Sequence, residues 1–132
     1  MKTSSACAGA VLVCGLASAA HGAAFSNGSF ELFNAGGADV YCPGGIDFCG
    51  QFNAGNAGIT GWTIGGHSID IVGPVGWAAS DGNWSLDLNG VGAGSISQAF
   101  DTVAGMHYRV SFDLGGIFYG GAAIKTGTVS AA

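Results

Sequence analysis

Glycine constrains this chain more than any other residue, because it supplies 26 of the 132 positions. Average usage is about 7%, so the load is well over twice normal. No Gly-X-Y period runs through the sequence, which excludes collagen. Only 2 prolines accompany 8 phenylalanines, 3 tryptophans and 3 tyrosines, which argues against general disorder. The composition therefore predicts short strands joined by many tight turns.

The start of the chain has the pattern of a secretory signal. Lys2 supplies a positive charge, residues 6–20 are apolar or small, and residues 17–24 offer several small-residue cleavage points. The apolar stretch is shorter than the roughly 20 residues of a membrane-spanning helix. We expect residues 1–23 to be a signal peptide and residues 24–132 to be one domain of a secreted or cell-surface protein, with no membrane insertion after signal removal.

Charge limits the classes of partner. The chain carries a net charge of −5, and beyond the expected signal the only cations are Arg109 and Lys125. Phosphate neutralisation needs a cluster of lysines and arginines. We therefore expect no nucleic-acid partner and no binding to anionic membranes, which leaves neutral polymers, divalent cations and other proteins.

Alternating and β-branched runs punctuated by glycine turns predict an all-β domain, a sandwich or a barrel. The expected strands cover residues 25–33, 59–64, 68–72, 84–88, 94–100, 108–114 and 124–130. Residues 34–58 are expected to form a long irregular loop, which in a compact domain is usually functional or mobile. Gln98 shares a strand face with Ile96 and Phe100, so its amide must find partners or lie at the sheet rim.

The clearest expected strand covers residues 106–114, where polarity alternates strictly. Apolar side chains fall on one face, at Tyr108, Val110, Phe112 and Leu114. Polar side chains fall on the other face, at His107, Arg109, Ser111 and Asp113. This alternation predicts a half-buried strand.

Two cysteines remain after the expected signal, Cys42 and Cys49 in the run CPGGIDFC. A single pair in a small secreted domain favours a disulfide. A metal site is the alternative, but no second cysteine pair or nearby histidine completes one.

Seven motifs follow one another along the chain: NGSFE at 27–31, ITGW at 59–62, SIDIVG at 68–73, ASDGNWSLDLNG at 79–90, GSISQ at 94–98, AG at 104–105 and YRVSFDL at 108–114. In this order they closely resemble the bacterial choice-of-anchor C surface-protein family, which is similar to a plant cell-wall domain of unknown function. The resemblance spans nearly all of residues 24–132.

The resemblance implies a galactose-binding-like jelly-roll β-sandwich, export, a C-terminal anchor and association with wall polysaccharide or extracellular matrix. It implies no catalytic residues. The run GGIFY at 115–119 departs from the family pattern, which continues with an asparagine-containing turn and further strands. We therefore expect that the last strands and the anchor of the family lie outside this sequence.

Ligand contacts are expected from two tryptophans. A flat ring offers a large apolar area and an edge donor for sugar stacking. Trp77 lies in the run GPVGWAAS and Trp84 follows the DGN turn, whereas Trp62 lies in a strand-like run and is better explained by core packing. By resemblance, Glu31 is a candidate ligand of a structural Ca²⁺ ion, although calcium wants six to eight oxygens. No other cofactor is expected.

No catalytic constellation is evident. His67, Ser68 and Asp70 lie together, but adjacent strand residues point to opposite faces, so His67 should not reach Ser68. A glycoside hydrolase or lyase would need an acid–base pair, and the carboxylates of this chain are expected on turns or polar strand faces. The sequence thus favours a non-catalytic polysaccharide-binding module, with a structural envelope or matrix protein as the alternative.

Overall fold

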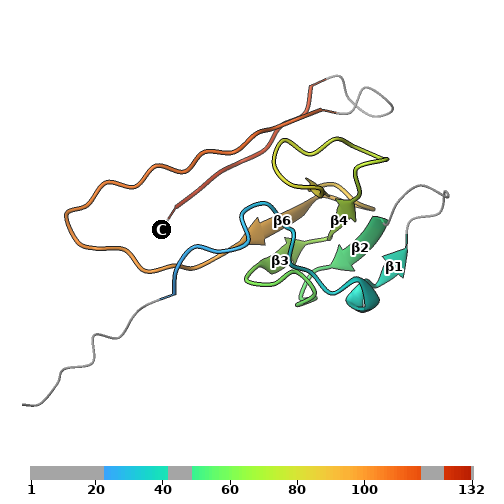
Figure 1. The fold of residues 1–132 in the computed structure, drawn as a ribbon, viewed down its shortest axis with the longest axis horizontal. Helices are drawn as coiled ribbons and strands as arrows, with labels where there is room; N and C mark the ends of the chain where they lie inside the picture. Colours follow the sequence, from blue (N-terminus) through green and yellow to red (C-terminus); the bar gives the residue numbers. More distant parts are fainter. Residues whose placement is uncertain (1–22, 42–48, 117–123, 132) are drawn as a thin grey trace, which may run out of the picture.

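The computed structural model describes residues 23–41, 49–116 and 124–131, and shows a nearly all-β chain (Figure 1). Its elements are the 3₁₀ turn η1 (Ala35–Gly37) and the strands β1 (Val40–Tyr41), β2 (Cys49–Asn53), β3 (Thr63–Gly66), β4 (Ser68–Val72), β5 (Ser85–Asp87) and β6 (Gly94–Ser97). The expected signal peptide lies outside the described residues.

The strands form two antiparallel sheets, as in a β-sandwich. One sheet has four strands in the order β1-β2-β4-β5, and the other pairs β3 with β6. In the larger sheet Gln51 of β2 and Asp87 of β5 both lie opposite Asp70 of β4. The sequence-based expectation of an all-β fold is confirmed at this level.

The core lies between the sheets and follows from alternation in β2 and β4. Phe52 lies opposite Ile69 in the strand register, and both side chains are fully buried together with Ile71. Ile59 and Ile64 complete this cluster. Burying each such side chain contributes roughly 1.5–3 kcal/mol, so these five residues supply much of the stability of a small domain.

Two glycines allow close backbone approaches, Gly94 between the two sheets and Gly66 within the β3–β6 sheet. A Cβ at Gly94 of β6 would overlap the backbone carbonyl group of Ser68 and come within 2.7 Å of Ile69 Cγ2. Gly66, with φ +70°, would place a Cβ 2.6 Å from the Ala93 carbonyl oxygen. Only a residue without a side chain fits at either position.

Five of the expected strand regions agree with the structure to different degrees. β4 coincides with residues 68–72, while β5 and β6 lie within 84–88 and 94–100. At 59–64 the strand begins later, at Thr63, after an isolated bridge between Ile59 and Phe33. That bridge is the only strand-like pairing within 25–33.

The expectation of an irregular loop over residues 34–58 is wrong, because β1 and β2 lie there. β2 pairs along its whole length with β4. Its sequence, CGQFN, carries one large apolar residue, so it lacked the β-branched content that marks a strand. Its strand pairing comes from the neighbouring strands rather than from its own propensity.

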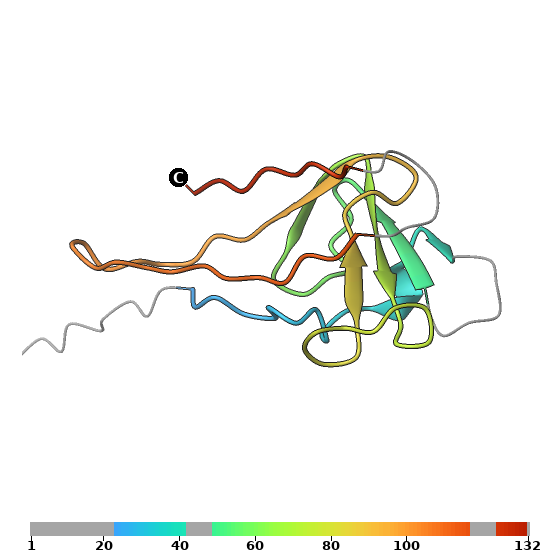
Figure 2. The same ribbon diagram turned by 90° about the horizontal axis from the view of Figure 1, so that it is seen from above.

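Residues 98–116 form an extended arm rather than a strand in a sheet. After β6 the chain leaves the two sheets, turns near Ala104 and Gly105, and runs back (Figures 1 and 2). Gly105 takes φ +80° in this turn, and Met106 N–H donates to the Val103 carbonyl at 3.1 Å. The expected burial of residues 108–114 is wrong: Tyr108 is 52% exposed and Leu114 is 79% exposed.

The described part of the tail, residues 124–131, also contains no strand. Among the described residues, no helix has the length and apolar character to cross a membrane.

Candidate functional site

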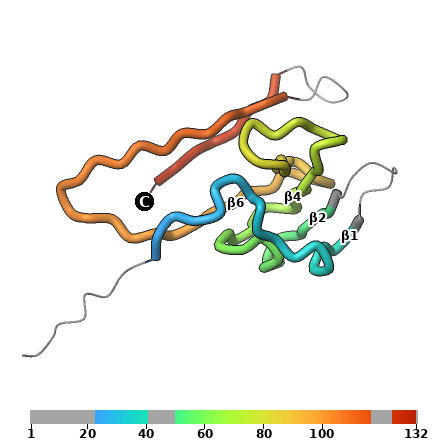
Figure 3. The backbone as a smooth tube through the Cα atoms, in the orientation of Figure 1, coloured from blue at the N-terminus to red at the C-terminus, as the bar shows by residue number. Residues whose placement is uncertain are grey.

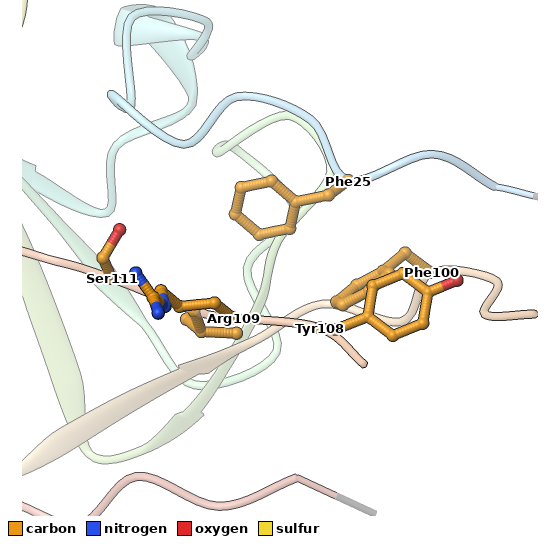
Figure 4. A pocket seen from close by; sticks show the side chains of 6 residues that line it. Phe25, Phe100, Tyr108, Arg109 and Ser111 are labelled. Carbon is orange, nitrogen blue, oxygen red and sulfur yellow. The ribbon is translucent and has the colours of Figure 1, made fainter. Parts of the chain in front are cut away.

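An aromatic cleft of about 290 Å³ opens between the N-terminal segment and the arm. Its lining consists of Phe25, Phe100, Tyr108, Arg109, Val110 and Ser111. Figure 4 shows the Phe25 ring on one side and the Phe100 and Tyr108 rings together on another, with Arg109 and Ser111 at the far end. This aromatic cleft is the candidate site.

Two ring pairs of the aromatic cleft contact edge to face, with Phe100 common to both. The centroids of Phe25 and Phe100 are 5.7 Å apart, and those of Phe100 and Tyr108 are 6.5 Å apart. Phe25 also packs perpendicular to Trp62, at 5.7 Å. Such ring pairs are stabilising beyond their buried area, so the rings hold one another in place although two of them are half exposed.

Gln98 fixes the N-terminal segment that carries Phe25. Its side-chain oxygen accepts from Ser26 N–H at 2.8 Å, while its Nε2 donates to the carbonyls of Ser26 at 3.1 Å and Gly61 at 2.7 Å. Gln98 therefore supplies the hydrogen bonds that a neighbouring strand would give. The expectation that its amide finds partners is confirmed, and Figure 3 shows the blue N-terminal segment passing beside the end of β6.

Asn27 fixes the other end of this segment. Its side chain accepts from Leu32 N–H at 2.9 Å and donates to the carbonyls of Leu32 at 2.9 Å and Thr60 at 2.8 Å. Its own carbonyl accepts from the Trp62 indole N–H at 2.9 Å. The motifs NGSFE and ITGW, far apart in sequence, thus meet at one point, with Trp62 packed as expected against the core.

Glu31, the candidate calcium ligand, holds the turn that precedes β5. One carboxylate oxygen accepts from the backbone N–H groups of Asn83 at 2.7 Å and Trp84 at 3.0 Å. The Asn83 backbone bond is the main cause that lowers the pKa of Glu31 below its usual value. Among the described residues, no group of three or more acidic, histidine or cysteine side chains could hold a metal ion, and the calcium site stays a prediction.

The two tryptophans predicted to bind sugar lie away from the aromatic cleft, since neither lines it. Trp84 is half-buried and packs edge to face on Phe33, with centroids 4.9 Å apart, against the core. Trp77 is half-buried in the turn after β4, where its backbone N–H donates to the Gly73 carbonyl at 3.1 Å. Trp84 packs against the core and Trp77 is partly exposed, and sugar binding by either residue stays a prediction.

The geometry of His67 and Ser68 differs from expectation. His67 lies between β3 and β4 rather than within a strand, so strand alternation does not separate the two side chains, and Nδ1 lies 3.3 Å from Ser68 Oγ. Ser68 is fully buried and its Oγ already accepts from Val91 N–H at 2.9 Å. A substrate cannot reach this hydroxyl, so the pair makes no nucleophile of the usual kind.

Asp70 and Asp87 face each other across β4 and β5. Oδ1 of Asp70 is buried and has no hydrogen-bond partner among the described residues. Burial, with a smaller contribution from the Asp87 charge, raises the pKa of Asp70 above its usual value. This pair lies on β4 and β5, and neither residue lines the aromatic cleft.

The predicted disulfide between Cys42 and Cys49 falls outside the described residues at Cys42, and the side chain of Cys49 is likewise outside them.

Sequence reasoning missed the aromatic cleft. Tyr108 was assigned to a buried strand face, and Phe25 and Phe100 to strands of their own. No local signal marks such a site, because Phe25 and Phe100 are brought together by long-range hydrogen bonds, those of Gln98 and the bond from Asp101 N–H to the Ala23 carbonyl.

Comparison with known proteins identifies one family. The model described as "Protein of unknown function (DUF642)" matches residues 23–132. No curated protein matches the chain, and no solved structure does.

Proposed function

The chain belongs to the DUF642 family of proteins of unknown function, and on that premise we propose that it is a non-catalytic module that binds polysaccharide of a cell wall or extracellular matrix. The observation that carries the proposal is the aromatic cleft. Its three rings present apolar faces and edges in a space at the small end of ligand pockets, about 290 Å³, which suits one sugar unit.

The chemistry of the aromatic cleft favours binding over catalysis. Its described lining residues include no carboxylate, whereas glycoside hydrolysis needs a pair of them. Aromatic rings stack on the apolar face of a sugar, while Ser111 and Arg109 can hydrogen-bond to its hydroxyls. A site of this size is expected to bind one unit of a repeating polymer with modest affinity.

The module would be exported, through cleavage of the signal peptide, and displayed at the cell surface as in the choice-of-anchor C proteins that its motifs resemble. Its two antiparallel sheets would be part of a galactose-binding-like jelly roll. These proposals are supported by the apolar start of the chain and by the seven motifs in order.

The test is retention of the purified chain on a panel of insoluble polysaccharides, with calcium and with chelator. Tyr108→Ala removes one ring and should abolish selective retention, whereas Tyr108→Phe keeps the ring and loses only the bond from Val103 N–H. Val91→Ala, at an apolar residue outside the cleft that is 73% exposed, is the control.

Trp77→Ala separates the two candidate sites. Unchanged retention places the ligand at the aromatic cleft, and loss confined to Trp77→Ala moves it to the turn after β4. If the folded parent chain is retained on no polysaccharide, the proposal is wrong and a structural envelope or matrix protein is the better account. If the parent chain is retained in the presence of calcium and released in the presence of chelator, the result would support the calcium site at Glu31.

A further inference from the structure

The returning half of the arm is an extended segment that pairs with no strand in the part of the chain that the structure describes. Its apolar side chains are exposed, with Val110 at 63% and Phe112 at 60%. Among the described residues, the backbone groups of residues 107–114 make no hydrogen bond. An extended segment with free N–H and C=O groups and an apolar face is a template for pairing with another chain.

The sequence of this segment is complementary to itself. When two copies of residues 108–114 run antiparallel with Ser111 opposite Ser111, Arg109 of each copy lies opposite Asp113 of the other. The same register places Val110 opposite Phe112 and Tyr108 opposite Leu114, in two symmetric sets. Opposite charges and apolar pairs directly across an antiparallel ladder are both stabilising.

Neighbouring registers lack this match. A shift of two residues in one direction places Arg109 opposite Gly115, and a shift in the other places it opposite Ser111. A shift of one residue would put apolar side chains opposite polar ones on the wrong face. Only pairing centred on Ser111 gives both arginines a carboxylate.

The charges of the segment point to the same partner. Arg109 and Asp113 share one strand face but make no ion pair in the described part of their own chain. Two copies that each carry a net charge of −5 repel one another. Association therefore depends on local complementarity, which the two crossed Arg–Asp pairs provide.

We propose that residues 108–114 pair with the same residues of a second copy, forming a two-fold symmetric, two-stranded antiparallel ladder about Ser111. Such an interface uses the same surface on both subunits and adds strand to strand through main-chain hydrogen bonds. The proposal goes beyond polysaccharide binding and does not depend on it, although residues 108–111 belong both to the ladder and to the lining of the aromatic cleft.

Variants that exchange the charges of residues 109 and 113 test the interface. Dimerisation of each intact chain is measured by sedimentation across a concentration series. Arg109→Asp and Asp113→Arg each replace two attractive pairs with two repulsive ones and should weaken dimerisation roughly tenfold or more. The double variant restores both pairs and should dimerise like the parent. A mixture of the two single variants should form a heterodimer, which a mere folding defect would not allow.

Cross-linking tests the register. Ser111→Cys brings two thiols face to face across the axis, within the Cα separation that a disulfide accepts. His107→Cys is the matched control, because the register places it opposite Gly115 and far from its own copy. A parent chain that stays monomeric, a dimer insensitive to charge exchange, or equal cross-linking at both positions would overturn the proposal.

Discussion

The carboxylate of Glu31 accepts the backbone N–H of Asn83 at 2.7 Å, across 52 residues of sequence. This bond and its neighbour from Trp84 attach the N-terminal segment to the turn before β5. Among the described residues, the strand-like pairing of this stretch is limited to the isolated bridge between Phe33 and Ile59, which lies outside both sheets. Side chains that imitate strand pairing therefore decide whether it stays in place.

Acid should weaken this attachment. The pKa of Glu31 is lowered in the folded chain. The stabilising effect of the Glu31 carboxylate is therefore complete above the pKa of an unfolded glutamate, about 4.3, and is lost as the pH falls below that pKa. Because the group is near the surface, we expect the loss to be about 1 kcal/mol. Urea unfolding at a series of pH values measures it, and Glu31→Gln should flatten the curve between about pH 5 and 3. An unchanged slope in that variant would assign the acid sensitivity to other carboxylates.

Gly82 should tolerate alanine worse than Gly105. Both have positive φ, +73° and +80°, so both lose roughly 1–2 kcal/mol on substitution. A Cβ at Gly82 would also overlap the Glu31 carboxylate, whereas nothing lies within 4 Å of one at Gly105. Thermal unfolding should show Gly82→Ala to be the more destabilising by about 1 kcal/mol. In a Glu31→Ala background the difference should vanish, and its persistence would mean that the clash is not with Glu31.

Removing one charge from the facing pair in β4 and β5 should stabilise the fold. The pKa of Asp70 is raised in the folded chain. The contribution of Asp70 to the free energy of unfolding is therefore most favourable below its pKa in the unfolded chain, and it worsens as the pH rises through its pKa in the folded chain. Asp87→Asn keeps the side-chain oxygen that accepts from Asn89 N–H and removes the repulsion. We expect a gain of about 0.5 kcal/mol at pH 7 that disappears near pH 3. Asp101→Asn, at an exposed position, is the control, and an equal gain there would point to net charge instead.

Gln98→Glu should release the N-terminal segment. A carboxylate keeps the acceptor for Ser26 N–H but turns the donor toward the carbonyls of Ser26 and Gly61 into a repelling oxygen. We expect a loss of about 2 kcal/mol, with faster amide exchange confined to residues 23–31. Gln98→Met removes the bonds without adding charge and should have the smaller effect. Protection in both variants that matches that of the parent chain would show that packing of Phe25, not this amide, holds the segment.

Alternation predicted the fold best where a strand is flanked on both sides. Residues 68–72 alternate between polar and apolar and become β4, which is bordered by β2 and β5. Residues 106–114 alternate at least as clearly, yet they lie exposed in the arm. Period-two polarity shows that a segment is suited to pairing, but whether a partner lies beside it is a property of the whole assembly.

Long-range side-chain bonds were beyond prediction for a related reason. Gln98 was expected to need partners, but nothing in its neighbourhood identified Ser26 and Gly61. The family resemblance predicts a calcium ligand at Glu31, and a single carboxylate near a turn does not show which backbone amides will reach it. The aromatic cleft depends on these bonds, so its position could not be derived from local patterns.

The separations of these bonds set the order in which the molecule can form. Residues 23–31 leave the ribosome well before their partners, because Trp62, Trp84 and Gln98 lie 35, 53 and 72 positions after the residues they bond. Vectorial synthesis therefore produces this segment long before it has anywhere to dock, and contacts of such separation form slowly. Its docking should be the last step of maturation, so a nascent chain halted before residue 98 would keep Phe25 accessible to chaperones and proteases.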